Sequence, residues 1–157
     1  MTVYHGSNIE IMKPDMAHSR LKLDFGKGFY TTSLLPQAEK WVERFRRGGG
    51  EGIINIYQLD EAVWTETRIL CFDTYSGEWL DFITACRQGK DMSDYDLIIG
   101  GVANDRVFNT CELYFKHYID KDTAIDRLKY EKPNQQICLK NQKNIDRYLH
   151  FERSKRK

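Results

Sequence analysis

The sequence predicts an α+β domain built on a mixed or antiparallel sheet. Short runs of strand-forming residues are interspersed with helical patterns, without the regular strand–helix–strand alternation of a doubly wound parallel sheet. The length of 157 residues favours a single domain that can bury a core without disulfides or metals. Hydrophobic residues make up 41% of the chain, and this composition excludes a disordered protein.

The first predicted elements are two short strands separated by a loop. Residues 2–5 read as a strand that ends at Gly6, and the charged stretch 13–28, which contains a proline, reads as the loop. Residues 29–32 are strand formers and follow two glycines, so the second strand is expected there.

Helical spacing begins after the second strand. Ser33 is a candidate N-cap, Pro36 suits the first turn, and the glycine run 48–50 ends the helix. One apolar face is formed by residues at i, i+3, i+4 and i+7, namely Ala38, Trp41, Val42 and Phe45.

The middle of the chain predicts strands around a second helix. Residues 52–59 alternate in polarity as a strand does, and residues 68–72 form another short strand. Ser76 is the expected cap of a helix that ends near Gly89, and residues 95–99 form a buried strand after it.

The last third of the chain predicts two helices and two strands. Apolar residues spaced helically over 107–118 give a third helix, and Asp122 is expected to cap a short fourth helix. A turn at 133–134 then precedes strands over 135–139 and 148–151.

Charge is balanced over the whole chain but not at its end. The formal net charge is +1, so no strong electrostatic partner is expected for the chain as a whole. We expect one domain over residues 1–151 and a short basic tail over 152–157. From Lys140 to the end of the chain there are seven basic residues and two acidic ones. This basic end could meet phosphates or an acidic partner protein, although a solvated, frayed terminus is the favoured interpretation.

The cysteines indicate neither a metal centre nor a disulfide framework. Cys71, Cys86, Cys111 and Cys138 form no CxxC pair, and no basic and apolar leader suggests secretion. Buried, reduced thiols in a cytoplasmic protein are therefore expected. No apolar run is long enough to span a bilayer, so no membrane partner is expected.

Three short segments could carry chemistry, and each also has a purely structural interpretation. His5 and Gly6 at a strand end could hold an amide and a ribose hydroxyl, or could simply satisfy their own loop. The glycines around Lys27 could admit a ligand onto Tyr30, or could form a hairpin entry. Gln136 opens an apolar strand, where its amide needs partners if it is buried.

Taken together, these segments resemble the ADP-ribosyltransferase superfamily, in its histidine–tyrosine branch, and most closely a bacterial family of unknown function. The resemblance extends from Val3 to Phe151 and rests on the order and spacing of its blocks. These blocks are Tyr4-His5-Gly6-Ser7, Asp24-Phe25-Gly26-Lys27-Gly28-Phe29-Tyr30-Thr31-Thr32, Gln37-Ala38 with Trp41, Glu78-Trp79-Leu80-Asp81-Phe82-Ile83, Tyr95-Asp96-Leu97-Ile98-Ile99-Gly100 with Val102-Ala103-Asn104-Asp105, and Gln136-Ile137-Cys138.

The resemblance implies a split, mixed β-core with flanking helices that grips NAD. His5 would bind the nicotinamide-side ribose, Tyr30 would stack on the nicotinamide, and Gln136, preferred over Gln135, would take the third position. Lys27 would meet the pyrophosphate or stay solvated. The implied NAD-binding set is Tyr4, His5, Gly6, Ser7, Lys27, Gly28, Phe29, Tyr30 and Asn104, with no metal.

Gln136 departs from the glutamate of better-known relatives. A neutral amide cannot act as a general base or offer a carboxylate's charge to the sugar. Asp105 is the preferred source of the missing charge, with Asp81 and Glu78 as weaker candidates. Asn104 or Asp105 could instead be only the N-cap of the following helix.

The expected function is mono-ADP-ribosyl transfer from NAD to a macromolecular acceptor, protein or nucleic acid, with release of nicotinamide. The compact size suits a toxin or defence component with a small antitoxin-like partner. A non-catalytic NAD- or ADP-ribose-binding module is the alternative that Gln136 favours. A nucleic-acid-binding protein that uses the basic tail is the weaker alternative.

Overall fold

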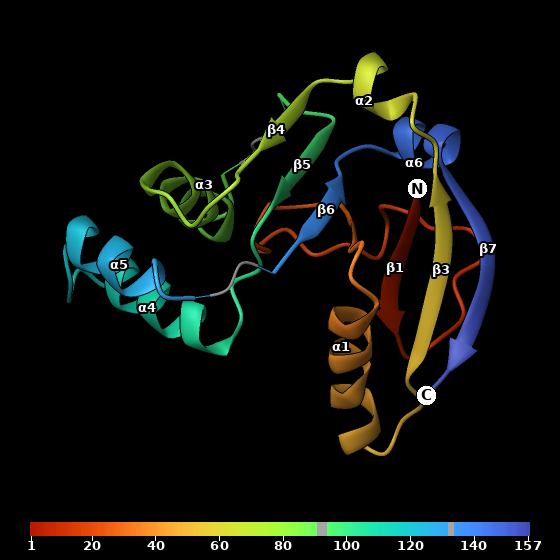
Figure 1. The fold of residues 1–157 in the computed structure, drawn as a ribbon, viewed down its shortest axis with the longest axis horizontal. Helices are drawn as coiled ribbons and strands as arrows, with labels where there is room; N and C mark the ends of the chain where they lie inside the picture. Colours follow the sequence, from red (N-terminus) through yellow and green to blue (C-terminus); the bar gives the residue numbers. More distant parts are fainter. Residues whose placement is uncertain (91–93, 132–133) are drawn as a thin grey trace.

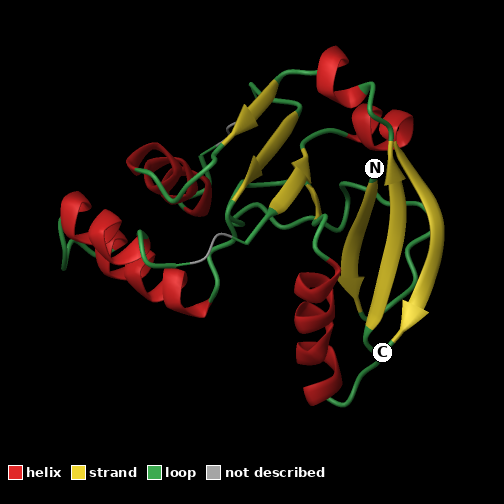
Figure 2. Cartoon of the chain, in the orientation of Figure 1, coloured by secondary structure: helices red, strands yellow, loops and turns green. Residues whose placement is uncertain are grey.

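Two sheets and six helices make up the described part of the chain, which in this computed structural model comprises residues 1–90, 94–131 and 134–157, with residue 105 described by its backbone only (Figures 1 and 2). The three-stranded sheet has the order β1 (Thr2–Ser7), β3 (Ile53–Leu59), β7 (Leu149–Arg156). The four-stranded sheet has the order β2 (Phe29–Thr31), β6 (Gln136–Leu139), β5 (Leu97–Gly100), β4 (Ile69–Cys71). The helices are α1 (Leu35–Arg47), α2 (Val63–Glu66), α3 (Gly77–Arg87), α4 (Asp105–Phe115), α5 (Lys121–Leu128) and α6 (Gln142–Tyr148).

The mixed α+β class predicted from the sequence is confirmed. All pairings in the three-stranded sheet are antiparallel. In the four-stranded sheet β2, β6 and β5 pair antiparallel, and β4 and β5 pair parallel.

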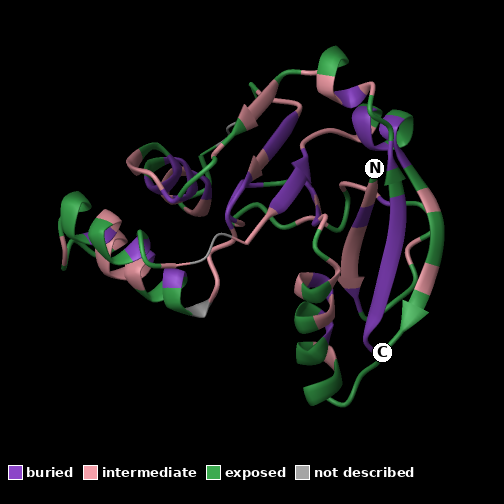
Figure 3. Ribbon diagram, viewed as in Figure 1, coloured by how far each residue is buried: buried purple, intermediate pink, exposed green. Residues whose placement is uncertain are grey.

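The central strand β3 is buried on both of its faces, as Figure 3 shows. Ile54 and Ile56 face α1, where they pack against Ala38 and Val42. Tyr57 points to the opposite face and belongs to a second apolar cluster shared with β6, α6 and β7. Helix α1 therefore covers one face of the three-stranded sheet, in agreement with Figure 1.

The two sheets meet where the middle of β1 lies beside Thr32, the residue that follows β2. The backbone N–H of Tyr4 donates to the carbonyl of Thr32 at 2.8 Å, and the N–H of Thr32 donates to the carbonyl of Tyr4 at 2.9 Å. This bridge brings the strand that carries His5 next to the strand that carries Tyr30.

Two of the predicted helix caps are wrong. Helix α1 has Leu34 at its N-cap without a side-chain bond, because the Ser33 hydroxyl donates instead to the side-chain oxygen of Gln135. Helix α5 is capped by Asp120, whose carboxylate accepts from the N–H of Thr123, and Asp122 lies in its first turn. The predicted cap of α3, Ser76, is confirmed.

The basic segment at the C-terminal end is a strand, which corrects the expectation of a solvated, frayed tail over 152–157. Strand β7 continues through Arg156, which pairs with Ile53 of β3. Arg156 also forms an ion pair with Glu51, and Lys157 forms one with Glu39 of α1. The end of the chain is therefore fastened to both β3 and α1.

Other differences are small. Helices α2 and α6 were not predicted, and Tyr148 ends α6 rather than opening the last strand. The predicted turn at 133–134 includes residue 133, which lies outside the described residues. In the described ranges, no helix is long and apolar enough to cross a membrane, and no group of three or more His, Cys, Asp or Glu side chains could hold a metal ion.

Candidate functional site

His5 is held on β1 in a defined tautomer. Its Nδ1 lies 2.6 Å from the backbone carbonyl oxygen of Tyr30. Because a carbonyl oxygen only accepts hydrogen bonds, Nδ1 carries the hydrogen and Nε2 keeps its lone pair in the neutral ring. Burial lowers the pKa of His5, and its ring stacks on Phe29 with centroids 4.6 Å apart. The imidazole is therefore an oriented, neutral hydrogen-bond acceptor through Nε2.

The Tyr30 phenol binds a neighbouring turn. Its hydroxyl donates to the carbonyl of Gly26 at 2.6 Å and accepts from the N–H of Phe25 at 3.0 Å. Burial raises the pKa of Tyr30 far above its ordinary value, so the hydroxyl keeps its proton. The ring packs against the apolar cluster around Trp79, and its stacking on a nicotinamide remains a prediction.

Gln136 is buried at the start of β6 and its amide is occupied. It is 7% exposed. Its Nε2 donates to Asp24 Oδ2 and to the carbonyl of Gly101, both at 3.2 Å. The expectation that a buried glutamine here needs specific partners is confirmed, and the partner carboxylate is Asp24.

Asp24 is the centre of a buried polar cluster. Its Oδ1 accepts from Arg87 Nε at 3.0 Å and also from Nη2 of the same guanidinium. Its Oδ2 accepts from Gln136 and from the backbone N–H of Ala103 at 3.0 Å. The Arg87 guanidinium in turn lies over the Phe108 ring, 4.7 Å from its centroid. The charge of Asp24 is thus compensated, and its position is fixed from three directions.

The segment from Asp24 to Gly26 joins the candidate residues into one chain of contacts. Asp24 binds Gln136, and the next two residues bind the Tyr30 hydroxyl. The carbonyl of Tyr30 accepts from His5. Gly26 has φ of +71°, a conformation that glycine adopts without strain. Residues on β1, β2 and β6 that are far apart in the sequence are therefore linked through one short turn.

Gly6 and Gly28 are required by packing inside the protein. A Cβ at Gly28 would lie 2.2 Å from the Sγ of Cys138 and 2.9 Å from the carbonyl of Leu139. A Cβ at Gly6 would lie 2.8 Å from Val42 and 2.9 Å from Trp41. The close approach that these glycines permit is to β6 and α1, which corrects the expectation that Gly28 leaves room for a ligand.

The remaining candidates on β1 and β2 are spread over two faces. Tyr4 points toward α1, whereas His5 faces the other way with its β3 partner Asn55. Phe29 is a core residue beneath His5. The buried Ser7 accepts from the N–H of Ile9 through its hydroxyl.

The other candidates lie on loops and at a helix start. Lys27 is exposed. Asn104 caps α4 by accepting from the N–H groups of Arg106 and Val107, as one of the two interpretations of this residue predicted. Asp105 begins α4, but its side chain lies outside the described residues, and its proposed charge role stays a prediction.

Asp81 and Glu78, the weaker candidates for the missing charge, lie on α3, apart from the Asp24 cluster in their contacts. Asp81 accepts from the Tyr114 hydroxyl and pairs with Lys121. At Glu78, hydrogen bonds at the start of the helix lower the pKa of the carboxyl.

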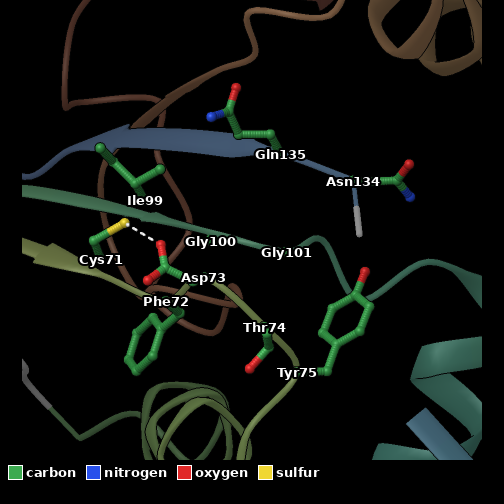
Figure 4. A pocket seen from close by; sticks show the side chains of 10 residues that line it. All are labelled: Cys71, Phe72, Asp73, Thr74, Tyr75, Ile99, Gly100, Gly101, Asn134 and Gln135. Carbon is green, nitrogen blue, oxygen red and sulfur yellow. Dashed lines mark hydrogen bonds between the residues drawn. The ribbon is translucent and has the colours of Figure 1, made fainter. Parts of the chain in front are cut away.

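A pocket of about 180 Å³ lies beside the Asp24 cluster (Figure 4). The loop after β4 (71–75), the end of β5 (99–101) and residues 134–135 line it, whereas His5 and Tyr30 do not. Pockets that hold a whole small-molecule ligand measure roughly 300–1,000 Å³, so this one fits a single ring or side-chain head group.

The thiol in the pocket wall is weakly reactive. Figure 4 shows the thiol of Cys71 directed toward the carboxylate of Asp73, 3.5 Å away. Cys71 is exposed, which corrects the expectation that all four thiols are buried. Partial desolvation and this carboxylate raise the pKa of Cys71, so the thiol stays protonated near neutral pH and is a poor nucleophile.

Sequence reasoning missed two members of the cluster, Asp24 and Arg87. Asp24 stands in one of the blocks that carry the resemblance, but the sequence does not show its role, because its partners are 63 or more positions away. The available signal was an aspartate directly before a Phe-Gly-Lys-Gly turn, in a loop that otherwise reads as solvated.

Comparison with known proteins identifies the family of this chain. A family model described as a protein of unknown function (DUF3990) matches residues 1–151, nearly the whole chain, so the chain belongs to this family. No curated protein and no solved structure matches.

Proposed function

We propose that this member of the DUF3990 family is a mono-ADP-ribosyltransferase that uses NAD as its co-substrate. The observation that carries the proposal is the chain of contacts from His5 through Tyr30 and the Asp24–Gly26 turn to Gln136. A neutral imidazole acceptor, a fixed tyrosine and a fixed amide on three adjacent strands suit recognition of a sugar and its base.

The arrangement of the two sheets supports the same proposal. A three-stranded and a four-stranded sheet meet at the Tyr4–Thr32 bridge, next to His5 and Tyr30. A core split in this way is what the resemblance to ADP-ribosyltransferases implies. In the proposal, the dinucleotide contacts this junction. NAD is too large for the small pocket, so most of the molecule lies outside it.

The reaction breaks the bond between nicotinamide and ribose. The electron pair of that bond leaves with nicotinamide, the acceptor's nucleophile forms the new bond to the ribose carbon, and the acceptor's proton passes to solvent or a base. Positive charge develops on the sugar, as in glycoside hydrolysis. In the proposal His5 accepts a ribose hydroxyl hydrogen through Nε2, and Tyr30 and Gln136 fix the orientation.

A second candidate is a module that binds NAD or ADP-ribose without turnover. Gln136 carries no charge, and the nearest carboxylate, Asp24, is compensated by Arg87. Such a site offers little negative potential to the developing charge on the sugar. This chemistry favours slow turnover of NAD. In the extreme case the protein binds NAD or ADP-ribose without any turnover.

The test is nicotinamide release from NAD by the purified chain, alone and with a lysate that supplies acceptors. We expect release by the wild type and its loss in His5→Ala and Gln136→Ala. Asp126→Ala on α5, far from the cluster in its contacts, is the matched control and should retain activity. Tight NAD binding without release would support the binding module, whereas neither binding nor release would contradict both candidates.

A further inference from the structure

Helix α1 carries a half-exposed tryptophan, Trp41, and the guanidinium of Arg44 stacks over its ring. Trp41 is 47% exposed, and the Arg44 guanidinium lies over its ring, 4.0 Å from the centroid. Aromatic rings and guanidinium planes are the groups on which proteins stack unpaired nucleobases. A stacked pair at the surface therefore offers a flat, positively charged platform.

The same helix has an excess of positive charge. Its four basic residues face only two acidic ones, and both acidic residues are already in ion pairs, Glu39 with Lys157 and Glu43 with Arg47. Across the part of the chain that the structure describes, Lys40, Arg44 and Arg46 have no carboxylate within ion-pair distance. These cations remain available to a polyanion.

The platform touches the backbone of the strand that carries His5, on the face of β1 opposite the imidazole. The edge of Trp41 lies against the backbone of Gly6, next to His5. Four positions earlier on the helix, Gln37 brackets the backbone of Gln135: its Nε2 donates to the Gln135 carbonyl at 2.8 Å, and its Oε1 accepts from the Gln135 N–H at 3.0 Å. Gln135 directly precedes Gln136.

We propose that a single-stranded nucleic acid binds along α1, with one base stacked on the Trp41–Arg44 platform. From Arg44 to Gln37 the helix rises about 10 Å, so a strand lying on this face reaches the Gln136 cluster within a few nucleotides. This inference rests on the proposed function, for which it makes the acceptor a single-stranded nucleic acid.

The observations favour a nucleic acid over an acidic protein partner. An acidic segment would use the charges but would leave the exposed Trp41–Arg44 stack without a role. A nucleobase can stack on Trp41 and Arg44 while the phosphates of the same strand contact Lys40 and Arg44. Single strands are favoured because a duplex presents no free base face.

Fluorescence anisotropy with a labelled 12-nucleotide single-stranded RNA tests this inference without NAD. We expect wild-type binding that weakens with added salt, and roughly tenfold weaker binding for Trp41→Ala, the loss of one base stack. Trp41→Phe should recover much of the affinity, because a ring remains. Arg44→Ala should also weaken binding and reduce its salt dependence.

Tyr130 provides the matched control. It is 80% exposed with the Lys129 amine 5.2 Å from its ring centre, so it is a second aromatic–cation pair outside α1. Tyr130→Ala should bind as the wild type does. Equal affinities of wild type and Trp41→Ala, or preference for a polyglutamate peptide over RNA, would overturn the inference. Because no NAD is present, that result leaves nicotinamide release as an independent test of the enzyme.

Discussion

A single hydrogen bond defines what His5 can recognise. Donation from Nδ1 to the Tyr30 carbonyl leaves Nε2 as an acceptor, and burial lowers the pKa of the ring, so that it stays neutral at pH 7. A neutral ring accepts a hydroxyl hydrogen, which a protonated ring cannot do. The recognition chemistry proposed for His5 therefore depends on its burial.

The lowered pKa of His5 predicts a pH dependence of stability. Below about pH 6.5 the unfolded chain takes up a proton at His5 and the folded chain resists it, so the free energy of unfolding falls as pH falls through this value. In His5→Asn this contribution is absent, and urea unfolding between pH 7.5 and 5.5 should show a shallower dependence. Equal slopes for both proteins would contradict the assigned environment.

The contacts of Gln136 predict that glutamate is not tolerated there alone. In Gln136→Glu two donated hydrogen bonds are lost, and a carboxylate faces Asp24 and the Gly101 carbonyl. We expect about 2 kcal/mol of lost stability in urea unfolding, partly recovered when Asp24→Asn is added. A fully stable single variant would show that Gln136 is not held as described.

Residue types at the site could be selected from the sequence, but their partners could not. His5, Tyr30 and Gln136 stand at strand ends beside glycines or open an apolar strand, and these local signals are visible in one segment. The Asp24–Arg87 pair joins residues 63 positions apart, so only the fold reveals it.

At the scale of elements, strand β2 is fixed by how closely it approaches β6. Gly28 precedes the strand, with Cys138 and Leu139 too near for any side chain. Gly28→Ala is expected to lose about 1–3 kcal/mol by overpacking, measured by chemical denaturation. Gly50→Ala, whose Cβ would lie 3.4 Å from its nearest neighbour, should cost much less. Equal effects of the two changes would contradict the packing.

Strand β7 predicts that removing residues 152–157 destabilises the protein. The deletion removes the strand partners of Ile53, Ile54, Asn55 and Ile56 together with the ion pairs to Glu39 and Glu51. A loss of at least 1 kcal/mol lowers Tm by about 2–4 °C in a chain of this size. The control keeps the strand and replaces Arg153 and Lys155 by Gln. An unchanged Tm after the deletion would indicate that residues 152–157 form a solvated, frayed tail, as the sequence predicts.

The ends of elements were harder to predict than their existence, for physical reasons. Residues 152–156 alternate poorly in polarity because β7 is an edge strand, where charged side chains discourage pairing with other chains. At α5 two aspartates two positions apart are both good caps, and only the backbone shows that Asp120 is used. Ser33 is a plausible cap for α1 by residue type, but its hydroxyl donates to the side-chain oxygen of Gln135 instead.

At the scale of the whole molecule, the fold brings β1, β2 and β6 into one junction although they come from the start and the end of the chain. The sequence predicted the mixed α+β class from its irregular order of elements, and that class is confirmed. The order of strands within each sheet could not be predicted, because it depends on pairings between distant segments. The candidate site exists only through those pairings.

The central claim is that NAD binds at this junction through His5. The most direct measurement is a titration of NAD into the ¹⁵N-labelled chain, following the Nε2 resonance of His5, with His5→Ala used to assign it. A saturable shift of that resonance, with the other three histidines unchanged, is the predicted result. Saturable binding of NAD that leaves the Nε2 resonance of His5 unmoved, or no binding at all, would contradict the account.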